Sequence, residues 1–202
     1  APPQSLSYYM YGKPQTAKRL YFDVIPKVTD EYIAHLSNYK NLEDDKKLES
    51  PIFYIDHDDL PEINLGNLSF ALLLNLVSAS NSENKDISSH NELLDRLIEY
   101  AINYYEDFVK PHKQFKTPTT EEKIALNELK EKLLELSPAD QIAENLQQIA
   151  YDIGNKHEFN LRQWFQSLYE ILLGQSSGPR IGSFFALYGV ENTIKLIDNC
   201  TK

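Results

Sequence analysis

The sequence has few of the residues that form cross-links, flexible repeats or membrane spans. Among 202 residues there is one cysteine, Cys200, so the chain can form no internal disulfide and no cysteine-based metal cluster. Seven glycines and ten prolines are too few for a collagen-like or low-complexity chain. The longest apolar run, residues 70–77, is interrupted by Asn75 and is much shorter than the roughly 20 residues of a membrane span. The chain also lacks a basic and apolar leader, so we expect a cytoplasmic protein without a membrane partner.

Sequence motifs of catalysis are missing as well. Neither a phosphate loop ending in G-K-[ST] nor a G-x-S-x-G nucleophile turn occurs. The densest group of possible metal ligands is residues 56–59, Asp-His-Asp-Asp, in which His57 and Asp58 could serve a metal phosphohydrolase. No second His-Asp pair accompanies it, and a solvated acidic loop explains it more simply. We therefore predict no catalytic residue, no metal site and no cofactor in this chain.

The charge is strongly negative and unevenly distributed. A net charge of -10 disfavours bulk attraction to nucleic acid, and we expect no DNA partner. Residues 12–27 nevertheless carry +3 and residues 107–118 are again positive, whereas residues 28–66 carry -7. Such patches allow an acidic protein to hold a polyanion on one face, although small basic clusters also arise by chance. The candidate phosphate contacts are Lys13, Lys18, Arg19, Lys27, Lys110, Lys113 and Lys116.

Helical periodicity dominates the first half of the chain. Asp23 precedes an amphipathic stretch with apolar residues spaced near four, and residues 70–79 read as a buried helix capped by Ser69. Ser89 and Glu92 have capping-box spacing ahead of a helical face that ends before Pro111. Residues 51–67, with two prolines and a glycine, are predicted to be irregular or to form a short β segment.

The second half reads as helical throughout. Thr119 with Glu122 predicts a helix start, Ser137 with Pro138 a second, and Asn160 a third that ends at Gly174. A last helix is expected from Val190. The connector between Pro111 and Pro118 separates the halves, so we predict an all-α protein with two subdomains, about 1–110 and 111–202.

The glycine-rich segment 174–189 precedes a helix and holds one arginine. Arg180, within GPRIG, could be exposed beside a helix start capped by Ser183, or the glycines could only fix a tight turn while Arg180 pairs with an acid. Aromatic residues on helices are core by default, but unpaired RNA bases stack on aromatic rings. The chain holds 13 tyrosines and 9 phenylalanines, so both uses of aromatic residues remain open.

Four blocks of sequence resemble the C-terminal region of class I lysyl-tRNA synthetases of the bacterial type. They include AKRLYFDVIP at residues 17–26 and the late block from Leu172 to Gly189, LLGQSSGPRIGSFFALYG, and the similarity runs in order from about Pro3 to Asp198. The tetrapeptide and loop signatures of class I catalysis, HIGH-like and KMSKS-like, are absent from the chain. The resemblance thus implies a fragment whose ATP, Mg and lysine site lies in an N-terminal catalytic domain of the same protein.

The resemblance also implies a fold and a partner. It predicts a helical anticodon-binding region similar to that of glutamyl-tRNA synthetases, in which residues 1–110 contact the tRNA stem and residues 111–202 cage the anticodon loop of tRNA(Lys). A uracil-rich lysine anticodon offers carbonyl acceptors, which suit Arg180 together with a flat aromatic ring. We therefore predict Arg180, Phe184, Phe185 and Trp164 as anticodon-binding residues. A helical protein-interaction scaffold without RNA binding, or less plausibly the metal phosphohydrolase, is the alternative.

Overall fold

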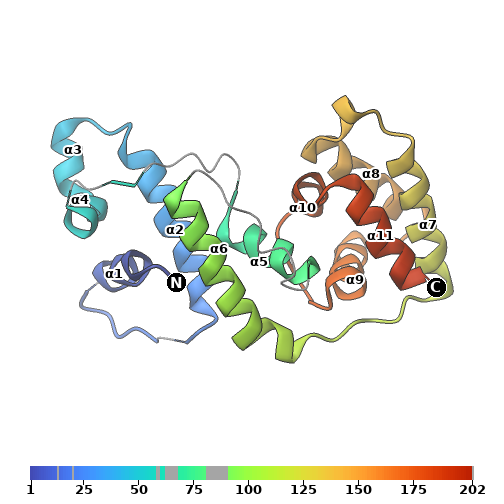
Figure 1. The fold of residues 1–202 in the computed structure, drawn as a ribbon, viewed down its shortest axis with the longest axis horizontal. Coiled ribbons are helices and arrows are strands. Elements are labelled where there is room, and N and C mark those ends of the chain that lie inside the picture. The colour runs from blue at the N-terminus through green and yellow to red at the C-terminus, as the bar shows by residue number, and fades with distance from the viewer. Residues whose placement is uncertain (13, 20, 58–59, 62–67, 81–90, 202) are drawn as a thin grey trace. The chain divides into compact units, whose positions relative to one another are not determined.

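The fold is known from a computed structural model, which describes all residues except 13, 20, 58–59, 62–67, 81–90 and 202. Within the described residues the chain is all-α, with eleven α-helices and no strand (Figure 1). None of these helices combines the length and hydrophobicity that crossing a bilayer requires. The described part of the chain thus confirms the predicted all-α class.

The chain divides into two compact units. Unit 1 comprises Ala1–Leu74 and Ser82–Tyr105, and unit 2 comprises Asn75–Asn81 and Glu106–Lys202. The sequence predicted a boundary after residue 110; the units divide after Tyr105, and unit 2 also includes the end of a helix from earlier in the chain.

Unit 1 is built on the first long helix. Its elements are α1 (Pro3–Tyr11), α2 (Val24–Tyr39), α3 (Asp44–Glu49), α4 (Pro51–Asp56), the first half of α5 (Phe70–Ala79), and α6 (Glu92–Tyr104). Helices α1 and α4 pack on α2. The hydroxyl of Tyr32, on α2, donates to both carboxylate oxygens of Asp56 at 3.0 and 3.1 Å, and burial together with this carboxylate raises the pKa of Tyr32.

The start of α4 corrects the prediction for residues 51–67. Residues 51–56 form a helix rather than an irregular or β segment, while residues 58–59 and 62–67 lie outside the described part. Ser50 accepts a hydrogen bond from the N–H of Ile52 at 3.4 Å, and Pro51 occupies the first helical position, where a missing N–H costs nothing. Burial of Ile52 at 0% exposure then stabilises a helix of only six residues.

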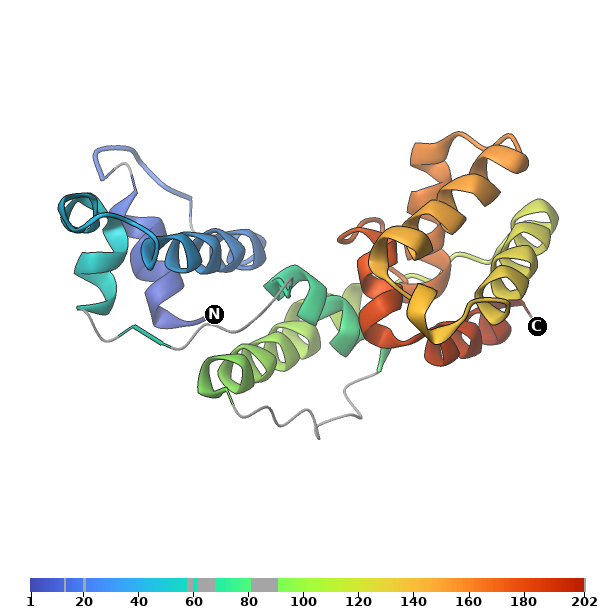
Figure 2. The same ribbon diagram turned by 90° about the horizontal axis from the view of Figure 1, so that it is seen from above.

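Unit 2 contains the remaining helices. They are the π-helical turn η1 (Tyr105–Val109, apart from its first residue), the 3₁₀ turns η2 (Lys110–His112) and η3 (Pro138–Asp140), and the helices α7 (Thr120–Leu134), α8 (Ala143–Lys156), α9 (Leu161–Leu173), α10 (Ile181–Tyr188) and α11 (Val190–Thr201). Helix α10 packs most extensively on α8, and α11 packs on α7; Figures 1 and 2 both show α7 and α11 side by side. The core of unit 2 includes four side chains at 0% exposure, Leu126, Leu146, Leu168 and Ile197.

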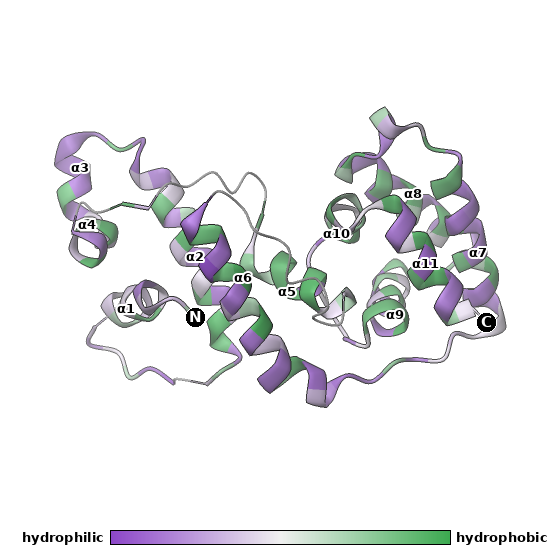
Figure 3. Ribbon diagram, in the orientation of Figure 1, coloured by the Kyte–Doolittle hydropathy of each residue, from purple (hydrophilic) through white to green (hydrophobic). Residues whose placement is uncertain are grey.

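Local sequence signals explain where several helices begin and end. Thr119 and Glu122 form a complete capping box, in which each side chain accepts a hydrogen bond from the other residue's backbone N–H at 3.2 and 2.9 Å. Asn160 caps α9, and Gly174 ends it with φ at 68°, a left-handed conformation that glycine adopts without strain. Ser69 caps α5 as predicted, and Figure 3 shows that this helix is hydrophobic over most of its length.

Three predicted helix starts are wrong by a few residues. Ser89 lies outside the described part, and Asn91 is the residue that caps α6, through the N–H of Leu94 at 3.1 Å. Ser137 and Pro138 lead only into η3, and α8 begins five residues later. Ser183 lies inside α10, which begins after Arg180.

Candidate nucleic-acid interface

An extended connector runs along the C-terminal end of α9. The backbone N–H groups of Gln114 and Lys116 donate to the carbonyls of Gly174 and Glu170, both at 3.1 Å. The last carbonyls of a helix have no partner inside the helix, so an extended chain at this end can satisfy them. The connector is therefore fixed to α9 by alternate residues.

The first of two hollows lies beside this junction. It has a volume of about 630 Å³, and Phe108, His112, Gln114, Phe115, Gln175, Ser176 and Ser177 are among its lining residues. The ring of Phe115 is 59% exposed. It packs against Gly174, where an added Cβ would lie 3.3 Å from the ring, and the Lys113 ammonium lies 5.3 Å from the ring centroid. The connector thus presents a fixed, accessible aromatic surface among amides and hydroxyls.

The second hollow adjoins the first, because Lys116 and Glu170 line both. It measures about 340 Å³ and also includes Phe159, Asn160 and Gln163. The Lys116 ammonium lies 2.5 Å from the Glu122 carboxylate and 2.8 Å from the Ser167 hydroxyl. Burial alone would raise the pKa of Glu122, but the hydrogen bonds from Lys116, the Thr119 N–H and Ser167 outweigh it and lower this pKa. Together the two hollows form what we call the polar groove of unit 2.

Arg180 lies three residues beyond Ser177, at the N-cap position of α10. Its side chain is exposed and makes no hydrogen bond or ion pair with another described residue. The neighbouring glycines are tightly packed: an added Cβ at Gly178 would lie 2.4 Å from the Tyr169 ring, and one at Gly182 would lie 2.2 Å from the carbonyl of Ala143. The segment is therefore a tight packing turn and also leaves Arg180 without an acidic partner among the described residues.

The three aromatic residues predicted to bind the anticodon are buried in unit 2. Trp164 is 2% exposed, Phe184 and Phe185 are 0% exposed, and the Trp164 indole N–H donates to the carbonyl of Ala150 at 2.9 Å. Phe184 and Phe185 line neither hollow, whereas Trp164 lines the second one, and that these three residues bind the anticodon stays a prediction. The ring of Phe159 stacks on Trp164 at 5.2 Å between centroids, and both residues line the second hollow.

The sequence analysis missed Phe115 and Phe159. A signal for Phe115 existed, because an aromatic residue between Lys113 and Lys116 in a helix-free connector has no helical face on which to be buried. For Phe159 there was no comparable signal in the sequence.

The connector lysines are engaged with protein groups. Lys110 lies 2.7 Å from Glu106, and the Lys113 ammonium donates to the carbonyl of Ser78 at 2.7 Å, with burial lowering its pKa to about 8. With Lys116 held by Glu122, these side chains fix the connector to unit 2. That Lys110, Lys113 and Lys116 also contact tRNA phosphates stays a prediction.

In unit 1, one predicted phosphate contact also has a structural role. The ammonium of Lys18 donates to the carbonyls of Tyr9, Met10 and Gly12 at the end of α1, where a cation is favourable. Arg19 is exposed, and Lys27 is exposed with Glu31 at 3.7 Å. Lys13 lies outside the described residues. Arg19 and Lys27 therefore remain candidates for phosphate contact.

The acidic cluster at residues 56–59 is only partly described. Asp56 is 8% exposed and its carboxylate accepts from Tyr32, whereas His57 is exposed with φ at 48°. Asp58 lies outside the described residues, and the described ones contain no group of three or more potential metal ligands. The carboxylate of Asp56 thus accepts a hydrogen bond that joins α4 to α2.

Comparison with known proteins gives two family matches. Residues 1–59 match the model "tRNA synthetases class I (K)", and residues 75–200 match the model "Anticodon binding domain". The second match covers more than half of the chain and contains the polar groove and Arg180.

Curated relatives match almost the whole chain. The lysine–tRNA ligase of Rickettsia bellii is 42% identical over 214 residues, and that of Rickettsia rickettsii is 41% identical over 215 residues. Each match covers 98% of this chain but 41% of the relative, so the chain spans about two fifths of the length of these relatives. The chain belongs to the anticodon-binding-domain family and corresponds to the anticodon-binding region of class I lysyl-tRNA synthetases.

Proposed function

We propose that this chain recognises the anticodon stem-loop of tRNA(Lys) for a class I lysine–tRNA ligase. The observation that carries the proposal is the polar groove together with Arg180, which has no ion pair in the described part of the chain; both lie inside the segment that matches the anticodon-binding family. In this proposal unit 2 holds the anticodon loop in a helical cage similar to that of glutamyl-tRNA synthetases. Unit 1 contacts the stem through exposed cations such as Arg19 and Lys27.

The chemistry of the groove suits unpaired bases. Single-stranded RNA is bound by stacking bases on aromatic rings and by hydrogen bonds to base edges. Phe115 supplies an exposed ring, and Gln114, Ser176 and Ser177 supply donors and acceptors around it. A uracil presents two carbonyl acceptors, which an arginine fork can satisfy. Binding of this kind supplies specificity, and attachment of lysine at the expense of ATP, with Mg, belongs to the catalytic part of the ligase.

Fluorescence anisotropy tests the proposal directly. The chain is titrated into a labelled tRNA(Lys) anticodon stem-loop and into the same stem-loop with a changed anticodon, at two salt concentrations. We expect a preference for the lysine anticodon that persists at the higher salt, because base contacts depend less on counterion release than phosphate contacts do. Equal and steeply salt-dependent binding to both would contradict base reading, and no binding at low salt would favour the protein-interaction scaffold.

Arg180 provides the most specific test of the groove. Arg180→Ala is expected to weaken binding of the lysine stem-loop by about 1 to 3 kcal/mol, the range for one good base contact. Lys195→Ala is the matched control, because Lys195 is exposed on α11, has no ion pair among the described residues and does not line the groove. Equal affinity of the two variants, with unchanged helical content, would remove Arg180 from the interface.

A further inference from the structure

Glu170 lies where the two hollows of the polar groove meet, since it lines both. Its backbone carbonyl accepts from the N–H of Lys116 at 3.1 Å, which fixes the residue against the connector. One carboxylate oxygen, Oε1, accepts from the side-chain amide of Gln166 at 2.7 Å. The other, Oε2, accepts no hydrogen bond from a described residue. Glu170 therefore presents an oriented carboxylate with acceptor capacity to spare.

The groove carries an excess of negative charge. The lysine, arginine and acidic side chains among its described lining residues are Lys116, Glu122 and Glu170. The Lys116 ammonium is paired with Glu122, so Glu170 has no cationic partner in the described part of the chain. Binding of a nucleic acid backbone depends on lysine and arginine. The groove is therefore unsuited to phosphates and suited to an uncharged base.

An aromatic ring beside a carboxylate favours a base that can donate a hydrogen bond. Phe115 is exposed in the first hollow, which Glu170 also lines. Stacking on a ring is possible for every base, whereas an ionised carboxylate only accepts hydrogen bonds. Uracil has one N–H on its pairing edge, at N3, and cytosine has an acceptor at the same position, which a carboxylate repels. The pair thus favours uracil over cytosine.

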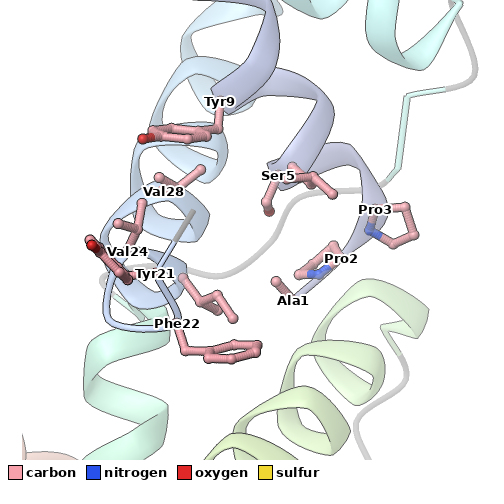
Figure 4. Close-up of a pocket in the computed structure, with 11 residues that line it drawn as sticks. Ala1, Pro2, Pro3, Ser5, Tyr9, Tyr21, Phe22, Val24 and Val28 are labelled. Carbon is pink, nitrogen blue, oxygen red and sulfur yellow. The ribbon is translucent and has the colours of Figure 1, made fainter. Parts of the chain in front are cut away.

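A hollow in unit 1 shows the contrast. It measures about 440 Å³ and lies between α1 and residues 21–28 (Figure 4). Proline, valine and aromatic side chains line it, and none of the described residues that line it is acidic or basic. Apolar contact has no direction, so such a wall cannot tell one base edge from another. Of these three hollows, the two of the polar groove are the ones in which a carboxylate can discriminate.

We infer, on the basis of the proposed function, that Glu170 is a specificity-determining residue. Its carboxylate accepts a hydrogen bond from the N3–H of a uracil stacked on Phe115 and keeps phosphates out of the groove. These two effects have opposite signs, because one strengthens binding of the correct loop and the other weakens binding through the RNA backbone. Loss of the carboxylate should therefore reduce discrimination between loops.

A double-mutant cycle tests the hydrogen bond. Fluorescence anisotropy measures binding of the unchanged chain and of Glu170→Ala to the tRNA(Lys) anticodon stem-loop. The same titrations are repeated with stem-loops in which one loop uridine at a time is replaced by N3-methyluridine, which lacks the N3–H. We expect methylation at one position to weaken binding of the unchanged chain roughly tenfold, and binding of Glu170→Ala less than about twofold.

Glu170→Gln tests the exclusion of phosphates. The amide keeps an acceptor but removes the charge, so binding of the stem-loop with a changed anticodon should strengthen severalfold at low salt. Glu191→Gln is the matched control, because it makes the same change in net charge at an exposed residue of α11 that does not line the groove. We expect this control to keep the preference of the unchanged chain.

The outcomes separate this role from the proposed function. If the unchanged chain prefers the lysine stem-loop but methylation weakens both chains equally at every position, the role of Glu170 is overturned and the proposed function stands. Equal behaviour of the two glutamine variants would likewise overturn the exclusion of phosphates. Absence of any anticodon preference in the unchanged chain would overturn both. Circular dichroism of Glu170→Ala checks that the helices are intact.

Discussion

The approach of α10 to α8 depends on Gly182, and this gives a quantitative prediction. An added Cβ at Gly182 would lie 2.2 Å from the carbonyl oxygen of Ala143 and 2.6 Å from the backbone N of Gln147. Both atoms belong to the backbone of α8, so neither can rotate away as a side chain could. In Gly182→Ala, α10 must therefore move by about 1 Å to reach ordinary contact distance, and Phe184 and Phe185 must move with it.

The expected destabilisation follows from three terms. Overpacking of a core contact costs about 1 to 3 kcal/mol, and weakening the bond from the Gly182 N–H to the Gln147 side chain, 3.0 Å in the structure, costs about 1 kcal/mol. The higher helix propensity of alanine recovers up to about 1 kcal/mol. A net loss of about 2 kcal/mol lowers the melting temperature of a unit of this size by roughly 10 °C.

Tryptophan fluorescence is the appropriate assay, because the single tryptophan, Trp164, is buried in unit 2 and reports on that unit alone. Ser183→Ala is the matched control: it changes the next residue of α10 to alanine without adding an atom. An unchanged melting temperature for Gly182→Ala would refute the close approach of the two helices and the placement of Arg180 that depends on it.

Three further predictions concern single residues. Phe115→Ala should weaken stem-loop binding by about 1 to 3 kcal/mol, the cost of losing one stacking ring. The melting temperature should stay nearly unchanged, because the ring is 59% exposed. Equal anisotropy curves for this variant and the unchanged chain would contradict a role of Phe115 in binding. Because the pKa of Glu122 is lowered in the folded state, its stabilising effect is present above the unfolded pKa of about 4.3 and is lost as the pH falls through the folded pKa. Urea unfolding of unit 2 between pH 6 and pH 3 should show this loss, and it should be smaller in Glu122→Gln. His57→Gly should stabilise unit 1 by up to about 1 kcal/mol, because His57 adopts φ at 48°, a left-handed conformation that glycine adopts without strain. Urea unfolding followed by circular dichroism measures this change. A destabilised variant would show that contacts of the His57 side chain outweigh the backbone strain.

The positions of many helix ends were predictable because the signals are local. Thr119 with Glu122, and Asn160 with Gly174, act through hydrogen bonds within one helical turn, so the order of residues alone specifies them. The family resemblance was also readable from the sequence, through blocks such as residues 17–26 and 172–189. The starts of α6 and α8 show the limit: Asn91 caps α6 two residues after the predicted Ser89, and α8 begins at Ala143 without any side-chain cap.

Which side chains face solvent was decided by the tertiary structure. Trp164 is buried and its indole N–H donates to the carbonyl of Ala150, and the Lys113 ammonium donates to the carbonyl of Ser78, a residue 35 positions earlier in the chain. Neither contact leaves a periodic pattern in the sequence, because packing between helices joins residues that local propensity does not relate. The sequence by itself therefore determined the helical class, the caps at Ser69, Thr119 and Asn160, and the family. The polar groove, the exposed Phe115 and the absence of an ion pair at Arg180 among the described residues result from how the helices pack.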